Sequence, residues 1–415
     1  MARPTDAEGW GALRADVNEA FSPGAPIRTL TDLSGRIEQI QRLSDIMLRA
    51  GEHAIVFGER GVGKTSLSQT FHTGLNRPTR KVQEIHVNCH PDDSFTSLWK
   101  KVFRRMGVTV DGGRTTVDQL YPGEITSDDV EVELGNYSLN DLPIIILDEF
   151  DQVQDERTKS LITATIKSMS DHRVHSKIVL VGIAGDVADL VAQHASLSRN
   201  LKQVKMPRLD LVDLEGIVGP RLRRCGMSIE DDALFQIAFL ARGLPYYCHL
   251  VGQYAALSAV DAKRTVVTED DVLDGLTAAV QDVDQTITET YLKAVVSQRP
   301  EETLYEPVLV ACALADADEL GRFQQSSVTA PLAEIAPRQP PYTPTTFAFH
   351  MNEFCEEKRL KILEKSGEAR NLRYRFSDPM MQPYVIIRAL QSKRLQIETF
   401  KKFTALRQPS LPIAP

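Results

Sequence analysis

One segment constrains the fold of this chain more than any other: residues 58–65, Gly-Glu-Arg-Gly-Val-Gly-Lys-Thr. It matches the pattern G-x-x-x-x-G-K-[ST], in which glycines let the backbone curl until successive N–H groups face a chain of phosphates. The pattern requires a buried strand before it and a helix after it. An apolar run, 53–57, precedes the segment, and a helix is expected to begin at Lys64. The sequence therefore predicts a strand–loop–helix unit that binds a nucleoside triphosphate.

Each residue of this loop has an expected contact with Mg-ATP. Lys64 can reach the β- and γ-phosphates, and the Thr65 hydroxyl can hold Mg²⁺. The remaining residues are expected to surround the phosphates, mainly through their backbone: Gly58, Glu59, Arg60, Gly61, Val62, Gly63 and Ser66.

A second motif supplies carboxylates. Four apolar residues, 144–147, predict a buried strand, and the run Asp-Glu-Phe-Asp follows at 148–151. Open α/β sheets bind ligands at the carboxyl ends of their strands. Asp148 is expected to hold Mg²⁺, and Glu149 to polarise the attacking water as a general base. The alternative for Glu149 is a solvated surface acid, and Asp151 is expected to be structural.

Further apolar runs predict the rest of the sheet. Buried strands are expected at 82–88, 144–147, 178–183 and 203–206, with helical patterns between most of them. Together with the strand before the loop, this alternation predicts a five-stranded parallel α/β core. A polar, acidic stretch at 108–142 contains two glycine-rich turns and is expected to be a surface insertion.

The chain of 415 residues favours two or three domains. We expect a flexible leader over 1–27, an ATPase core over 28–208, a helical lid over 209–296 and a winged-helix-like module with a basic tail over 297–415. No apolar run is long enough to span a membrane. Five scattered cysteines indicate reduced thiols in a cytoplasmic protein. The net charge of -8 argues against a wholly basic nucleic-acid coat.

The loop, the Asp-Glu-Phe-Asp run and the Gly35-Arg36 pair resemble AAA+ ATPases of the replication-initiator and origin-recognition kind. They are also similar to the related STAND signalling ATPases and transposition-regulator ATPases. The resemblance covers about residues 28–290 in layout and the last 100 residues more weakly. It implies that Gly35 and Arg36 lie beside the adenine. The alternative for Arg36 is an ordinary residue of a helix's first turn.

The same resemblance implies three further site residues. Asp186 follows the strand at 177–182, where the family places a polar sensor, usually Asn; a helix cap is the alternative. Arg199 precedes the last core strand, like the arginine that enters a neighbouring subunit's ATP site, with Arg208 or a plain surface arginine as alternatives. Pro245 stands where initiators usually carry an arginine sensor. Its Gly-x-Pro context resembles the STAND proteins and implies packing against the nucleotide.

The C-terminal module resembles a winged helix, with a hairpin over 360–376. Basic residues follow its course and could contact duplex DNA or form a solvated face: Arg370, Arg373, Arg375, Arg388, Lys393, Arg394, Lys401, Lys402 and Arg407. We expect an enzyme that hydrolyses ATP to ADP and phosphate, forms a homo-oligomer on ATP binding and works as a conformational switch. Two functions remain open: a DNA-associated regulator, or a signalling switch, for example in phage defence, that controls a separately encoded effector.

Overall fold

The computed structural model describes residues 4, 6–110, 113–183, 199–297, 303–367 and 371–405. The chain divides into two compact units. The sheet unit comprises residues 26–59 and 63–206, and the C-terminal unit comprises 1–25, 60–62 and 207–415. Among the described residues, no helix combines the length and the apolar character needed to cross a bilayer.

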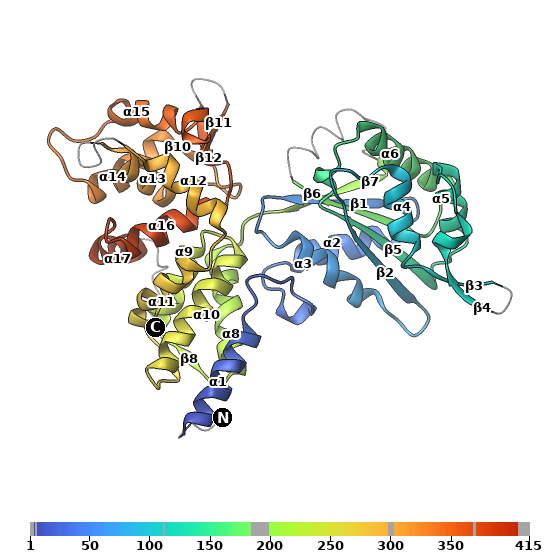
Figure 1. The fold of residues 1–415 in the computed structure, drawn as a ribbon, viewed down its shortest axis with the longest axis horizontal. Coiled ribbons are helices and arrows are strands. Elements are labelled where there is room, and N and C mark those ends of the chain that lie inside the picture. Colours follow the sequence, from blue (N-terminus) through green and yellow to red (C-terminus); the bar gives the residue numbers. More distant parts are fainter. Residues whose placement is uncertain are drawn as a thin grey trace, which may run out of the picture. The chain divides into compact units, whose positions relative to one another are not determined.

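The sheet unit is built on five parallel strands, in the order β2-β5-β6-β1-β7 (Figure 1). They are β1 (His53–Gly58), β2 (Lys81–Asn88), β5 (Asp141–Asp148), β6 (Lys177–Gly182) and β7 (Leu201–Met206). All five correspond to predicted strands, so the predicted fold class is confirmed. The central strands β5 and β6 are buried almost throughout, because a parallel sheet is covered on both faces.

Alternate side chains of the strands point to opposite faces, and helices cover both (Figure 1). One face, with Ile85, Ile145 and Leu147, packs in a core with Trp99 and Phe103. That core is closed by helices α4 (Phe95–Phe103), α5 (Ser127–Gly135) and α6 (Glu156–Asp171). The other face carries α2 (Ile37–Leu48) and α3 (Lys64–Thr70), which contact β1.

The predicted surface insertion at 108–142 is wrong in one respect. The stretch forms a hairpin of β3 (Gly107–Val110) and β4 (Gly113–Thr116), a short turn of helix (Val117–Leu120) and α5. Its apolar side chains are part of the sheet unit's core: Val117, Ile125, Val130 and Leu134. Many acidic residues surround these apolar positions in the sequence, so the buried face was not recognised. Val130 and Leu134 nevertheless have the four-residue spacing of a helix face.

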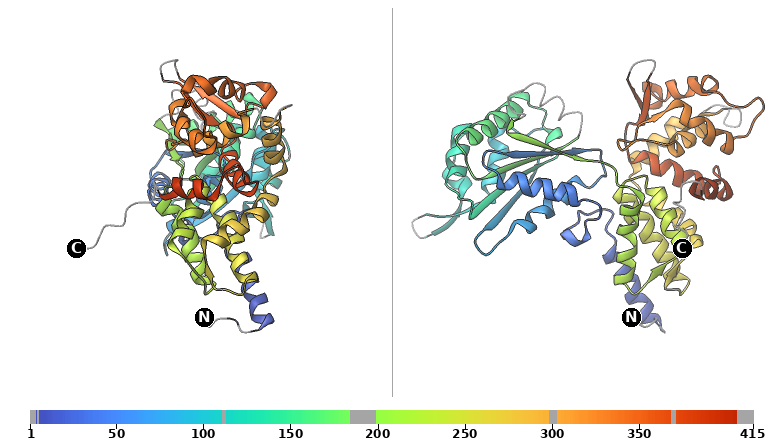
Figure 2. Two further views of the ribbon diagram at one scale, coloured as in Figure 1. Left: turned by 90° about the vertical axis from the view of Figure 1, so that its left-hand side faces the viewer. Right: turned by 180° about the vertical axis from the view of Figure 1, so that it is seen from behind.

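The predicted flexible leader is also wrong over most of its length. Helix α1 (Ala7–Ala20) begins at Asp6, whose side chain accepts a hydrogen bond from the backbone of Gly9. Its buried residues Trp10, Leu13 and Val17 recur at three and four, and α1 contacts two helices of the C-terminal unit, α8 (Leu211–Arg224) and α10 (Pro245–Asp261) (Figure 2). Only a few residues of this helix are apolar, so the average polarity of the segment resembles that of a polar tail.

The rest of the C-terminal unit begins with helices, as predicted. Besides α8 and α10 these are α9 (Asp231–Ala241), α11 (Glu269–Gln281) and α12 (Gln285–Val295), with a small pair of strands, β8 (Ser228–Ile229) and β9 (Val266–Val267). A winged-helix arrangement follows. Its elements are α13 (Tyr305–Leu314), β10 (Phe323–Gln324), α14 (Thr329–Ile335), α15 (Pro344–Glu353), β11 (Leu363–Ser366), β12 (Arg373–Phe376), α16 (Met381–Gln391) and α17 (Ile397–Ala405). The predicted boundary between lid and winged helix stays a prediction.

Candidate nucleotide-binding site

The loop between β1 and α3 has the backbone that a phosphate cradle needs. Gly61 and Gly63 have φ angles of 83° and 91°, in the left-handed region that favours glycine. A Cβ added at Gly63 would meet no described atom within 4 Å, so the space beside this residue is open. The predicted helix begins at Lys64. These residues therefore fit the phosphates of a nucleotide.

Lys64 is folded back on its own loop. Its ammonium group donates hydrogen bonds to the carbonyl oxygens of Gly58, at 3.0 Å, and Glu59, at 2.9 Å. Burial lowers the pKa of Lys64, and the nearby carboxylates of Asp151 and Asp148 act in the opposite direction. Phosphate oxygens are anionic acceptors, which bind an ammonium group more strongly than neutral carbonyls do. A bound triphosphate would therefore compete well for this side chain.

Asp148 is buried at the carboxyl end of β5, with 3% of its surface exposed. Its Oδ1 accepts the backbone N–H of Glu149 at 2.9 Å, and its Oδ2 lies 3.2 Å from Nε2 of His86. Burial alone would raise the pKa of Asp148. Hydrogen bonds from His86, Thr65 and the Glu149 backbone outweigh burial and hold this pKa below its usual value. Thr65 and Asp148, both predicted to hold Mg²⁺, thus lie in direct contact.

Glu149 adopts a left-handed backbone, with φ 55° and ψ 38°. This conformation is uncommon for a residue with a side chain, and such backbones concentrate at functional sites. The residue is exposed while its N–H is fixed to Asp148. An exposed carboxylate anchored next to the metal position can meet a water molecule, as the predicted general base must. Asp151 packs against Gly182 of β6, which suits the structural role expected of it.

His86 is absent from the site residues that the sequence predicted. Along β2, Ile85 and Val87 face the core, while Glu84, His86 and Asn88 lie on the opposite face. This alternation of polar and apolar residues was visible in the sequence. What it could not show is that β2 lies beside β5, with Asn88 in register with Asp148.

A cavity of about 600 Å³ opens at this end of β2. It is lined by residues of α3, β2 and α4, by one residue before α2 and by two residues that follow β2 and α4, and none of them is acidic: Pro26, Thr65, Gln69, His86, Val87, Asn88, His90, Lys101 and Arg105. The predicted magnesium ligand Thr65 therefore lies in the wall of this cavity.

Three further residues of the sheet unit, Gly35, Arg36 and Ser66, were predicted to contact the nucleotide. Gly35 has a φ of 67°, and Arg36, only 2% exposed, precedes the first turn of α2. Such burial is unusual for an ordinary first-turn arginine. Ser66 accepts a hydrogen bond from the backbone of Ile27 at 3.1 Å. The expected contact of Gly35 and Arg36 with adenine stays a prediction.

Arg199 is exposed and lies just before β7. The next residue, Asn200, accepts the backbone N–H of His53 at 2.7 Å, so Arg199 lies at the amino ends of the parallel strands. The phosphate loop lies at the carboxyl end of β1, about 20 Å away for a strand of this length. Arg199 therefore does not serve the site of its own chain. Its contact with a neighbouring subunit stays a prediction, with a plain surface arginine as the alternative.

The alternative finger, Arg208, is engaged within the C-terminal unit. It is half-buried and donates to Oε1 of Gln382 at 2.5 Å and to the carbonyl of Arg242 at 3.2 Å. Its guanidinium group packs so closely against Gly321 that a Cβ at this position would clash with it. These contacts make Arg208 a structural cation and favour Arg199 as the finger. Asp186 lies outside the described residues.

Pro245 is the first residue of α10 and follows Gly243, whose φ is 87°. Proline suits this position, since the first helical N–H needs no partner within the helix. This local role is sufficient to explain the residue, and its packing against a nucleotide stays a prediction.

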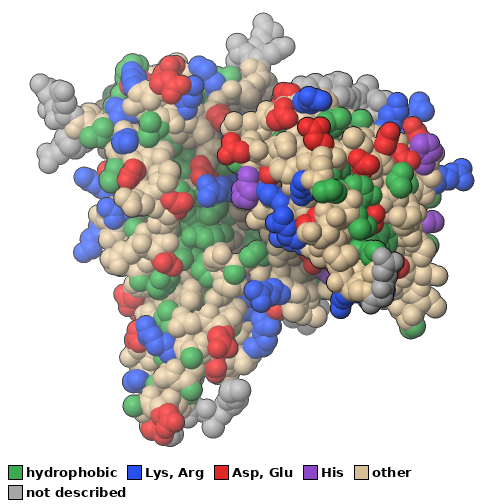
Figure 3. Space-filling model, turned by 45° about the vertical axis from the view of Figure 1, so that its right-hand side comes forward, with side chains coloured by type: hydrophobic (Ala, Val, Ile, Leu, Met, Phe, Trp, Pro, Cys, Tyr) green, Lys and Arg blue, Asp and Glu red, His purple; other side chains and the backbone are tan. Residues whose placement is uncertain are grey.

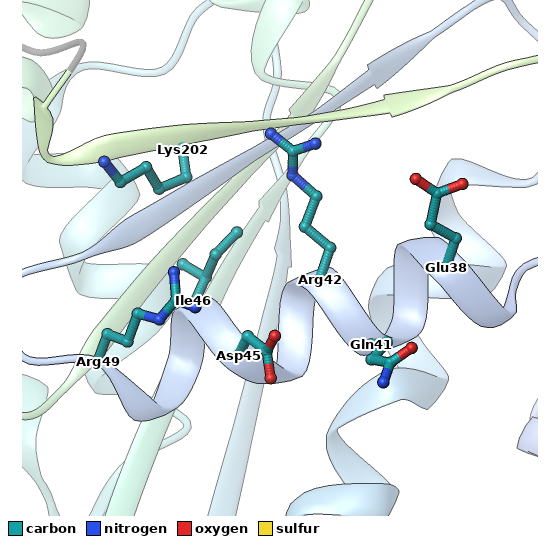
Figure 4. A pocket seen from close by; sticks show the side chains of 7 residues that line it. All are labelled: Glu38, Gln41, Arg42, Asp45, Ile46, Arg49 and Lys202. Atoms are coloured by element: carbon teal, nitrogen blue, oxygen red, sulfur yellow. The ribbon is translucent and has the colours of Figure 1, made fainter.

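A hollow of about 370 Å³ lies between α2 and β7 (Figure 4). Charged side chains of both signs line it, with one glutamine and one isoleucine: Glu38, Gln41, Arg42, Asp45, Ile46, Arg49 and Lys202. Its lining is too polar for the apolar pocket that usually receives a small ligand. Lys202 places it near the amino end of β7, where Arg199 lies.

Most of the basic residues predicted for DNA contact that the structure describes are paired with acids, while Arg370 and Arg407 lie outside the described residues. On the wing, Arg375 donates to Glu364 at 2.8 Å and Arg373 lies 3.9 Å from Asp318. Three later cations pair with acids of other elements: Arg394 with Glu306, Lys401 with Glu269 and Lys402 with Glu334. The sequence, in which only Glu398 opposes the tail, gave no sign of these pairs. Acidic and basic side chains are likewise interspersed over the face in Figure 3.

Comparisons with known proteins agree with this architecture. Residues 48–191 match the family model of the AAA domain. The ORC1-type DNA replication protein of Thermoplasma volcanium is 25% identical over 205 residues, and the ORC1-type DNA replication protein 2 of Thermoplasma acidophilum is 26% identical over 206. Each alignment covers 48% of this chain, which spans about half the length of these relatives. The ORC2 protein of Aeropyrum pernix, solved with ADPNP and ADP, has a TM-score of 0.53 and 14% identity, covering 94% of this chain and 98% of its own.

Proposed function

We propose that this chain, a AAA+ P-loop protein that resembles the origin-recognition initiators, binds Mg-ATP and hydrolyses it to ADP and phosphate. One observation carries the proposal. Lys64 and Thr65, which follow the glycine loop, lie at the same edge of a parallel sheet as Asp148 and the exposed Glu149. A cation, a hydroxyl and two carboxylates in this order are what phosphoryl transfer from ATP to water requires.

The residues have distinct tasks in this proposal. Lys64 binds the phosphates, and the glycine loop orients them through its N–H groups. Thr65 and Asp148 would hold Mg²⁺, which supplies positive charge against the phosphate oxygens when bound. Glu149 accepts a proton from the attacking water, because its carboxylate is exposed while its backbone is fixed.

Glu149→Gln tests the reaction directly. The amide keeps the size of the side chain but accepts a proton poorly, so ATP binding should persist while phosphate release falls by about 10²-fold or more. Glu124→Gln, which alters another exposed acid, should leave both unchanged. Wild-type phosphate release in the Glu149→Gln protein would remove Glu149 from the mechanism, and a wild-type protein without any release would refute the ATPase proposal.

We further propose that ATP drives a switch between conformations or assemblies, with the exposed Arg199 contacting a neighbouring subunit. A winged-helix arrangement and relatives named as DNA replication proteins support duplex DNA as a partner. The paired cations of the wing and tail mean that phosphates would have to exchange with carboxylates in existing ion pairs. Contacts of this kind at a surface cost little to open, so the pairs weaken DNA binding without preventing it.

A further inference from the structure

We propose that His86 is a positioning residue for the Mg²⁺ end of the site. The imidazole donates its Nε2–H to Oδ2 of Asp148 and fixes the direction in which this carboxylate presents its remaining lone pairs. The inference rests on the proposed function, because it assigns a task toward the bound metal. It adds a residue outside both sequence motifs, on the edge strand β2.

The register of the sheet makes this contact. β2 and β5 are parallel neighbours, with His86 opposite Ile146 and Asn88 opposite Asp148. Residues two apart on a strand share a face, so His86 lies on the face that carries Asp148. The two side chains meet at 3.2 Å, between Nε2 and Oδ2.

Asp148 needs such a donor. Its side chain is 4% exposed, and an ionised carboxylate buried to this extent must have its acceptor positions filled. The Glu149 N–H occupies Oδ1 at 2.9 Å, and Thr65 and His86 supply side-chain hydrogen bonds. Thr65 is itself an expected metal ligand, so among these side chains His86 is the one left solely to orient the carboxylate.

Packing does not explain His86. The core face of β2 belongs to Ile85 and Val87, while the His86 side chain, 18% exposed, lines the 600 Å³ cavity. The side-chain amide nitrogen of Gln69 on α3 lies 3.4 Å from the same ring nitrogen. Both groups are donors when Nε2 carries a proton, so the carboxylate of Asp148 is the acceptor for this N–H. Removing hydrogen-bonding partners of metal ligands typically lowers metal affinity by about 10- to 100-fold.

The test compares ATP affinity of the full chain with saturating Mg²⁺ and with EDTA, by calorimetry in a Glu149→Gln background that prevents turnover. The ratio of the two affinities measures the contribution of Mg²⁺. His86→Leu removes the donor at similar volume and should reduce this ratio about 10-fold, while affinity in EDTA stays at the parent value. His86→Gln places an amide N–H near the position of Nε2 and should restore most of the ratio. His90→Leu alters another histidine of the cavity and should change nothing.

Three results would overturn the positioning role: an unchanged ratio in His86→Leu, an equal loss with and without Mg²⁺, or a Gln variant as impaired as the Leu variant. An equal loss would mark a merely structural residue, and unfolding temperatures of the variants would show the same. If the parent protein binds no ATP, the proposed function itself fails. Parent binding with an unaltered ratio in His86→Leu refutes only the inference about His86.

Discussion

At the scale of residues, His53 shows how burial sets the chemistry of a side chain. It opens β1, is 0% exposed, and its Nδ1 accepts the backbone N–H of Ile178 at 3.0 Å. Burial, and secondly the charge of Lys177, lower the pKa of His53 to about 3. The unfolded chain takes up this proton near pH 6.5, while the folded chain does so only near pH 3.

The free energy of unfolding should therefore fall with acidification between pH 6.5 and pH 3, and the contribution should be fully present above pH 6.5. From pH 7.5 to pH 5.5 His53 should account for a loss of about 1.4 kcal/mol. Urea unfolding followed by Trp99 fluorescence in a Trp10→Phe background measures it. His53→Asn keeps an acceptor and should abolish this part of the loss, whereas the exposed His175→Asn should not. An identical pH dependence in His53→Asn would refute the assignment.

At the scale of elements, the sequence predicted those strands and helices whose formation depends on a short local pattern of residues. Apolar runs such as 144–147 identified all five strands of the sheet, and the glycine loop located the start of α3. Helix α1 and the core face of α5 were not predicted. Their few apolar residues stand among many acids, and only the surfaces against which they pack show that they are buried. The His86–Asp148 contact escaped for a related reason: strand order is a property of the whole sheet.

The wing of the C-terminal unit, β11 and β12, carries the prediction about DNA. If it contacts phosphates, Arg373→Ala with Arg375→Ala should weaken duplex binding and reduce the slope of log affinity against log salt by up to about two units. Anisotropy titrations at several salt concentrations measure this slope. Lys167→Ala, an exposed cation of the sheet unit, is the matched control. No duplex binding by the wild-type protein at low salt, with or without ATP, would favour a protein partner for this module.

At the scale of the whole molecule, the position of Arg199 predicts that activity depends on assembly. If the exposed Arg199 at the amino edge of the sheet completes the ATP site of a neighbouring subunit, ATPase activity per subunit should rise with protein concentration. Fingers of this kind contribute about 10³-fold or more in rate. Arg199→Ala should lower turnover at unchanged ATP affinity, while Arg157→Ala, at another exposed arginine, should not.

Mixing two inactive variants tests the same interface. Arg199→Ala keeps an intact general base, and Glu149→Gln keeps an intact finger. A mixed assembly can pair the two, so the mixture should hydrolyse ATP faster than either variant alone. Turnover per subunit that is independent of concentration, in a protein that stays monomeric with ATP, would show that Arg199 has no such role.

The central claim is that ATP binds through Lys64 at the carboxyl edge of the sheet, and calorimetric titration of ATP with Mg²⁺ tests it most directly. The wild-type chain should bind one ATP, and Lys167→Ala should bind it equally well. Lys64→Ala should weaken binding by about 10-fold or more, since a charge-assisted hydrogen bond contributes about 1.5 to 3 kcal/mol. Equal ATP affinity in Lys64→Ala and the wild-type protein would contradict the claim.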